Sequence, residues 1–213
     1  MDIDYWRQPQ GVSLPQDDLR FLYIPDDVEA YMTAELAWQV YDYQQAHVED
    51  GRQITKAVMV TMGGLLPGVL IHDHIAWSAK KHIPAIEFGT LGVQCYAGPG
   101  KPLDQPRVMQ ELTIDVNGHV VAVVEDLVAL GGTAKFVATY LMEERGASKI
   151  VLIAPFLKNP NITESMEAIW YGLVPKDTWI ITPREKVETL VKRVPHWRDH
   201  GANMAVCESN LRA

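Results

Sequence analysis

Adjacent acidic residues, Glu125 and Asp126, precede a glycine pair and a threonine, Gly131, Gly132 and Thr133. Paired carboxylates can bind sugar hydroxyls and an accompanying divalent cation. Glycines at the start of a helix let main-chain N–H groups approach a phosphate, and a threonine hydroxyl can donate to it as well. The pattern predicts a site for a phosphorylated ribose. The alternative is an ordinary strand-to-helix turn whose acids face solvent.

The residues around this segment predict the elements that position it. The apolar run Val120–Val124 is typical of a buried strand, and an apolar stripe from about Thr133 predicts a helix that ends at Gly146. In open α/β sheets, ligands bind in the crevice at the carboxyl ends of the strands. We therefore expect Glu125 and Asp126 to lie in a binding crevice.

Short apolar runs alternate with helical patterns and glycine-rich turns from Lys56 onward. Further strands are predicted over residues 57–60, 85–88 and 150–154. A tight turn at Met62, Gly63 and Gly64 leads into a helix that begins at Leu65. This alternation is typical of an α/β fold with a parallel sheet.

The ends of the chain and one internal segment lie outside this pattern. Residues 1–50 contain one helical pattern, which starts near Asp26, and no convincing strand, so we predict an N-terminal helical arm. Its apolar stripe consists of Met32, Leu36, Val40 and Tyr43. Residues 89–112 are rich in glycine and proline, which predicts a long mobile loop. The predicted domains are the arm, a core over residues 51–185, and a helical tail over residues 186–213.

The segment from Val120 to Thr133 resembles the phosphoribosyl pyrophosphate loop of type I phosphoribosyltransferases, in which an apolar strand and two acids precede a small-residue turn closed by threonine. Residues 60–68 resemble the pyrophosphate loop of the purine-salvage branch. A further resemblance is to the xanthine-guanine type of that branch. The matching residues of this chain, in the same order, are Lys158, Thr178-Trp179-Ile180, Pro183 and Glu185. The resemblance spans about residues 56–185. It implies an α/β fold with a central parallel sheet, flanking helices and a mobile hood loop.

The resemblance also implies an activity. The family transfers the 5-phosphoribosyl group from phosphoribosyl pyrophosphate to a nucleobase, here expected to be a purine, and releases pyrophosphate with the help of Mg²⁺. Glu125 and Asp126 would bind the ribose hydroxyls and magnesium. Arg107, or Lys101 as the second candidate, would reach the pyrophosphate from the hood, which excludes water that could hydrolyse the donor.

The resemblance also implies roles for the remaining site residues. Three groups of residues would bind the phosphate, the pyrophosphate and the base, and one further residue would bind the metal. The phosphate loop, implied to bind the 5′-phosphate, consists of Ala129, Leu130, Gly131, Gly132 and Thr133. The pyrophosphate loop consists of Met62, Gly63 and Gly64. The residues implied to bind the base are Lys158, Trp179 and Ile180, and Glu185 is implied as a metal ligand beside Asp126. Taken alone, a lysine is more often a solvated surface charge and a tryptophan more often a core aromatic.

The sequence departs from the family pattern at three site positions. Enzymes that use six-oxopurines usually have an aspartate in place of Ala129. The family pattern also has a threonine in place of Leu130 and a basic or polar residue in place of Met62. These departures support an alternative from another functional class. In that alternative, the protein is a noncatalytic regulatory or binding protein that senses phosphoribosyl pyrophosphate or a nucleotide.

The composition limits the partners. The 213-residue chain has 27 Asp and Glu against 19 Lys and Arg, a formal net charge of −8, which argues against binding to nucleic acids or an anionic membrane. The apolar runs are shorter than the ~20 residues that span a bilayer. The acidic N-terminus does not resemble a secretory signal, and two cysteines form no disulfide framework, so we expect a cytoplasmic protein. We also expect a homo-oligomer, either a dimer or a tetramer.

Overall fold

The computed structural model describes residues 20–77, 84–98 and 101–182. The chain divides into two compact units. The larger unit is Tyr31–Val174, and the smaller one combines Met1–Ala30 with Pro175–Ala213. In the smaller unit, the described residues form a two-stranded parallel sheet of β1 (Arg20–Tyr23) and β9 (Thr178–Ile181), in which Phe21 is the partner of Trp179.

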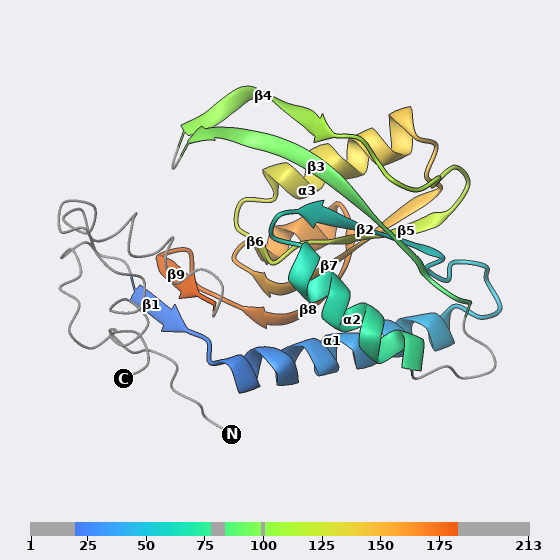
Figure 1. The fold of residues 1–213 in the computed structure, drawn as a ribbon, viewed down its shortest axis with the longest axis horizontal. Helices are drawn as coiled ribbons and strands as arrows, with labels where there is room; N and C mark the ends of the chain where they lie inside the picture. Colours follow the sequence, from blue (N-terminus) through green and yellow to red (C-terminus); the bar gives the residue numbers. More distant parts are fainter. Residues whose placement is uncertain (1–19, 78–83, 99–100, 183–213) are drawn as a thin grey trace. The chain divides into compact units, whose positions relative to one another are not determined.

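The larger unit is built on a seven-stranded sheet in the order β4-β3-β2-β5-β7-β6, with β8 paired to β7 (Figure 1). The strands are β2 (Lys56–Thr61), β3 (Glu87–Gly98), β4 (Lys101–Gln110), β5 (Val120–Val124), β6 (Leu127–Val128), β7 (Lys149–Leu157) and β8 (Glu167–Leu173). Every pairing is parallel except that of β3 with β4. The central strands are continuous apolar runs because helices cover both faces of the sheet.

Alternate residues of each central strand face different helices. On one side, α1 (Asp26–Ala46) and α2 (Leu65–Trp77) contribute Leu36 and Ile71 to a core shared with Val124. On the other side, α3 (Gly132–Thr139) and the π-helix η1 (Tyr140–Glu144) pack against Val123 and its neighbours. Figure 1 shows α2 and α3 on opposite sides of the strands. The last helical element is the 3-10 turn η2 (Pro160–Glu164).

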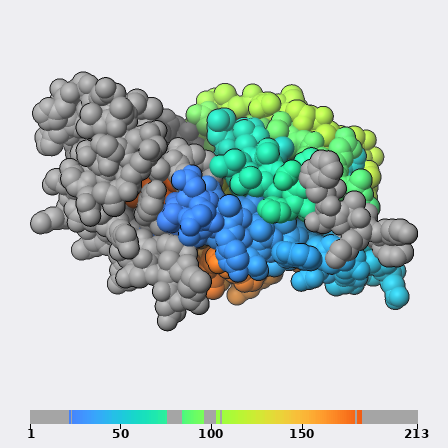
Figure 2. Space-filling view, turned by 60° about the horizontal axis from the view of Figure 1, so that its bottom comes forward, coloured from blue at the N-terminus to red at the C-terminus, as the bar shows by residue number. Residues whose placement is uncertain are grey.

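The predicted fold class is confirmed, and the predicted central elements lie where the sequence placed them. Strand β5 has the predicted bounds, and helix α2 begins at Leu65 directly after the glycine turn. Helix α1 begins at Asp26. Its residues Leu36 and Val40 are buried in the core of the larger unit, and Figure 2 shows the outer surface of the helix beside that of α2. The predicted tail, residues 186–213, lies outside the described residues.

Two predictions about irregular segments were wrong. Residues 89–112 do not form one long loop, because β3 and β4 pair there as an antiparallel ribbon. Pro102 and Pro106 hid the strand from sequence analysis, yet both are compatible with β4 because it lies at the edge of the sheet. The segment before residue 50 also contains a strand, β1, which is only four residues long.

No helix in the described part of the chain is long and apolar enough to cross a membrane.

The centre of the sheet should dominate stability. Leu152 in β7 is fully buried between α3 and the neighbouring strands, whereas Leu173 at the end of β8 is 58% exposed. We expect Leu152→Ala to lower the free energy of unfolding by about 2–5 kcal/mol. The matched change Leu173→Ala should alter it by no more than about 0.5 kcal/mol. Urea denaturation measures both, and equal midpoints for the two variants would contradict this assignment of the core.

Candidate functional site

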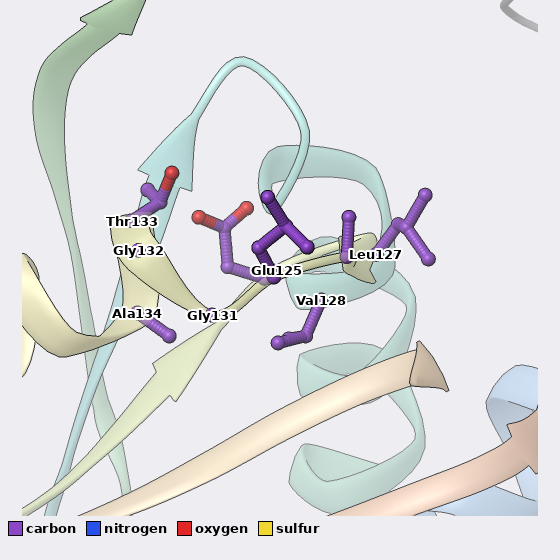
Figure 3. A pocket seen from close by; sticks show the side chains of 9 residues that line it. Glu125, Leu127, Val128, Gly131, Gly132, Thr133 and Ala134 are labelled. Carbon is purple, nitrogen blue, oxygen red and sulfur yellow. The ribbon is translucent and has the colours of Figure 1, made fainter. Parts of the chain in front are cut away.

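A cavity of about 150 Å³ lies at the carboxyl end of β5, around the chain that leads into α3 (Figure 3). It is lined by Glu125, Leu127, Val128, Ala129, Leu130, Gly131, Gly132, Thr133 and Ala134. In Figure 3 the Glu125 carboxylate and the Thr133 hydroxyl lie on the same side of this loop. All five residues of the predicted phosphate loop therefore line one cavity together with the first acid of the pair.

The shape of the phosphate loop depends on its first glycine. Gly131 precedes α3 with a φ of 86°, a left-handed conformation that favours glycine. A Cβ atom there would also lie 2.9 Å from Ile162 Cδ1, so the end of that buried side chain would have to shift. At Gly132, by contrast, a Cβ atom would meet nothing within 4 Å. The first N–H groups of a helix have no partner within it, so the start of α3 can donate to an anion beside this open space.

The pyrophosphate loop lies directly against the acid pair. Strands β2 and β5 are parallel neighbours, with Met59 paired to Val124, so the turns that follow them meet at the same edge of the sheet. A Cβ atom at Gly63 would lie 2.6 Å from Asp126 Oδ1, and one at Gly64 would lie 1.9 Å from the Val124 carbonyl oxygen. The pyrophosphate loop thus packs against Asp126, which precedes the phosphate loop in the sequence.

Glu125 is in an unusual electrostatic environment. It is only 8% exposed, and its burial raises the pKa of its carboxyl group to about 8, with a further contribution from the negative charge of Asp126. The carboxyl group therefore holds a proton at neutral pH when no cation is bound. The main chain at Glu125 is fixed because its N–H donates to the Ile153 carbonyl of β7 at 3.0 Å.

Two apolar side chains project from the loops into solvent. Met62 is 81% exposed in the pyrophosphate loop, and Leu130 is 71% exposed in the phosphate loop. Neither side chain can donate a hydrogen bond. The loops therefore carry no charged side chain, and an anion there would rely on the Thr133 hydroxyl and on main-chain N–H groups other than that of Gly64, which donates to the Val60 carbonyl.

The other predicted site residues of the larger unit, Lys158 and Arg107, lie outside the lining of the cavity. Lys158 follows β7 and is half-buried, and its N–H donates to the Val128 carbonyl at 2.9 Å, so its main chain adjoins the cavity wall. Arg107 is exposed on β4, where its guanidinium donates to Gln94 Oε1 at 3.0 and 2.9 Å, and it does not line the cavity.

Trp179 and Ile180 belong to β9 of the smaller unit, and Ile180 is buried there. Glu185 and Pro183 lie outside the described residues.

Sequence analysis missed the residues that support the phosphate loop from behind. These are Asn159 and Ile162, which belong to the segment after β7. The available signal was the Asn159-Pro160 pair, which is typical of a turn. It gave no indication of which loop the turn contacts.

No family model and no curated protein matches the sequence. Solved structures do match it. A purine phosphoribosyltransferase from Pyrococcus horikoshii superimposes with a TM-score of 0.57 and 19% identity, over 78% of this chain and 94% of its own. The chain has the phosphoribosyltransferase fold. The hypoxanthine phosphoribosyltransferase of Trypanosoma cruzi, solved with the product IMP, gives 0.53 and 14% identity over 68% of this chain and 77% of its own.

A further similar structure has a different ligand. It is a hypothetical protein from Neisseria gonorrhoeae with bound ppGpp, which superimposes with a TM-score of 0.58 and 16% identity. The match covers 78% of this chain and 90% of that one. These similarities establish the phosphoribosyltransferase fold that the sequence predicted.

The two glycines at the site should respond differently to a methyl group. Gly64→Ala places a Cβ atom against the main chain of β5, which cannot give way easily, so we expect a loss of about 1–3 kcal/mol of unfolding free energy. Gly132→Ala meets open space, so its effect should stay within about 0.5 kcal/mol. Urea denaturation compares the pair. An equally stable Gly64→Ala variant would show that the two loops do not pack as described.

Stability should also depend on pH through Glu125. Its pKa is about 8 in the folded protein and about 4.5 when unperturbed, so between these values the folded state binds more protons than the unfolded state. The free energy of unfolding contributed by this group therefore falls as pH rises from about 4.5 to about 8. Glu125→Gln removes the dependence, so the variant should gain stability relative to wild type as pH rises.

Urea midpoints with a chelator present, at about pH 5 and about pH 9, measure this difference. The exposed Glu144 provides the matched control, Glu144→Gln. If the Glu125→Gln and wild-type midpoints change in parallel with pH, the proposed environment of Glu125 is wrong.

Proposed function

We propose that the protein is a magnesium-dependent phosphoribosyltransferase that transfers the 5-phosphoribosyl group from phosphoribosyl pyrophosphate to a purine base and releases pyrophosphate. One observation supports this proposal above the others. The main chain of Gly63 lies against the Asp126 carboxylate, beside the cavity that the phosphate loop lines. Candidate sites for the three parts of the donor, namely its 5′-phosphate, ribose and pyrophosphate, therefore adjoin one another.

In this proposal each loop binds one part of the donor. The 5′-phosphate accepts hydrogen bonds from the start of α3 and from the Thr133 hydroxyl, beside the open space at Gly132. The ribose hydroxyls donate to Glu125 and Asp126. Pyrophosphate accepts hydrogen bonds from the main-chain N–H groups of Met62 and Gly63, since that of Gly64 donates to the Val60 carbonyl.

The residues present fit a magnesium ion that is bound together with the substrate. Mg²⁺ usually binds through one or two carboxylates plus substrate phosphates and water, rather than in an all-protein cage. The Asp126 carboxylate, which lies against Gly63 of the pyrophosphate loop, suits this mode, and no cluster of three or more metal-binding side chains occurs among the described residues. When bound, the ion would neutralise charge on the departing pyrophosphate. Glu185 is the second ligand that we propose.

Catalysis would rest on positioning and on electrostatic stabilisation. As the bond to pyrophosphate breaks, positive charge develops on the ribose, and in this proposal the carboxylate of Asp126 stabilises that charge. Water must be kept out at this stage, and we assign that role to the ribbon of β3 and β4. Arg107 on β4 would reach the pyrophosphate by exchanging its hydrogen bonds to Gln94 for the ligand.

The base would be bound by Lys158, Trp179 and Ile180. A planar base needs an aromatic or apolar platform, which Trp179 and Ile180 would provide. Its exocyclic oxygen needs a fixed hydrogen-bond donor, which Lys158 would provide. The similar structures support a purine as the substrate class, since they include enzymes named for purine and hypoxanthine.

A second candidate function is nucleotide sensing without catalysis. The exposed apolar side chains of Met62 and Leu130, and the absence of an acid at Ala129, favour it. The structure of the Neisseria gonorrhoeae protein with bound ppGpp supports it as well. Both functions use the same cavity, so they differ in whether a bound donor is turned over.

Pyrophosphate release in the presence of phosphoribosyl pyrophosphate, Mg²⁺ and a panel of bases distinguishes the two functions. The panel should contain hypoxanthine, guanine, xanthine, adenine, uracil and orotate, and calorimetry should measure binding of the donor and of ppGpp. Turnover with a purine supports the enzyme. Binding without turnover on any base supports the sensor, and a protein that binds neither ligand has neither function.

Asp126→Asn should lower kcat/KM for the donor by about 10- to 100-fold, because it removes the carboxylate proposed to bind magnesium and the ribose. The matched control is Asp73→Asn, since Asp73 is exposed on α2. The control should retain wild-type kinetics. Equal activity of the two variants would remove Asp126 from the mechanism.

A further inference from the structure

The segment that follows β7 supports the phosphate loop from behind. Residues Leu127 and Val128 of β6 pair with Phe156 and Leu157 at the end of β7. One residue further on, the N–H of Lys158 donates to the Val128 carbonyl at 2.9 Å. The wall of the cavity therefore continues the sheet as far as Val128, where regular strand pairing ends.

Beyond that point, the side chain of Asn159 replaces the strand hydrogen bonds. Its Nδ2 donates to the Leu130 carbonyl at 3.3 Å. Its Oδ1 accepts a hydrogen bond from the Asn161 N–H at 3.3 Å and so caps the start of η2. One amide group thus joins the phosphate loop to the turn behind it.

The turn η2 also contacts the loop through an apolar side chain. Ile162 is 1% exposed, and its Cδ1 would lie 2.9 Å from a Cβ atom at Gly131. The contact is close because Gly131 has no side chain. The hydrogen bond at Leu130 and the packing at Gly131 hold the two residues that immediately precede α3.

We propose that Asn159 is a positioning residue for phosphate binding: it fixes the Leu130 carbonyl and thereby aims the N–H groups at the start of α3 into the cavity. This inference rests on the proposed function, because the phosphate is that of the ribose. Since the Leu130 side chain offers no hydrogen-bond donor, the affinity for phosphate depends on the Thr133 hydroxyl and on how accurately the main-chain N–H groups are held. Asn159 itself does not line the cavity.

Asn159→Ser separates the two contacts of the side chain. A serine hydroxyl can still accept a hydrogen bond at the start of a helical turn, but it is too short to donate to Leu130 as well. The cap of η2 is therefore kept while the support of the loop is lost. Asn159→Ala removes both contacts, and Asn161→Ser makes the same chemical change at an exposed position two residues away.

The experiment measures binding of ribose 5-phosphate and of phosphoribosyl pyrophosphate by calorimetry, the thermal midpoint of unfolding, and kcat and KM. For Asn159→Ser we expect affinity for both ligands to fall about five- to tenfold, as for the loss of one hydrogen bond. The midpoint of unfolding should stay near that of wild type. KM for the donor should rise by the same factor with kcat unchanged, because the 5′-phosphate is bound equally in the ground and transition states. Asn161→Ser should match wild type throughout.

The possible outcomes separate this inference from the proposed function. If wild type binds both ligands and Asn159→Ser binds them equally well, Asn159 has no positioning role, while the proposed function stands. A fall in affinity that is matched by a fall in the unfolding midpoint assigns Asn159 a merely structural role and also overturns the inference. If wild type binds neither ligand, the proposed function fails and the inference fails with it.

Discussion

Gly63 and Gly64 leave room for the turn after β2 to lie against the end of β5. A Cβ atom at either position would overlap the Asp126 carboxylate or the Val124 carbonyl, so the contact requires glycine on one side and a fixed strand end on the other. Pairing of β2 with β5 brings the two turns to the same edge of the sheet, and the glycines then allow them to touch. The phosphate loop leaves the same end of β5, so its place beside the pyrophosphate loop depends on this contact as well.

The site that results relies on main-chain shape more than on side-chain charge. Exposed Met62 and Leu130 occupy positions where a hydroxyl or a cation would strengthen anion binding directly. Main-chain N–H groups are weaker attractants than a lysine, but they are already oriented when the ligand arrives and lose no rotamer entropy on binding. Such a site tolerates changes in the side chains that project from its loops. It is sensitive to the residues behind them.

The sequence was sufficient to predict the elements that follow a simple local rule. The apolar run of β5 and the glycine turn after β2 signal their own structure, and the resemblance to a known family joined them into one site. The β3–β4 ribbon was missed because Pro102 and Pro106 are poor strand residues unless the strand is at an edge, and position in a sheet is not a local property. Asn159 was missed for a similar reason, since its function depends on which distant carbonyl its amide reaches. The base-binding residues Trp179 and Ile180 remain a prediction, because they belong to the smaller unit.

The prolines of β4 also have a consequence for the behaviour of the protein in concentrated solution. An edge strand presents unpaired N–H and carbonyl groups that can recruit a strand from another molecule and start aggregation. Proline has no N–H group, so Pro102 and Pro106 interrupt the row of donors along β4. The irregular register between β3 and β4 bends the same strand and makes it a poorer template. The β4 edge of the sheet is thus a poor template for strand pairing with another molecule, because of the same prolines that obscured the strand in the sequence.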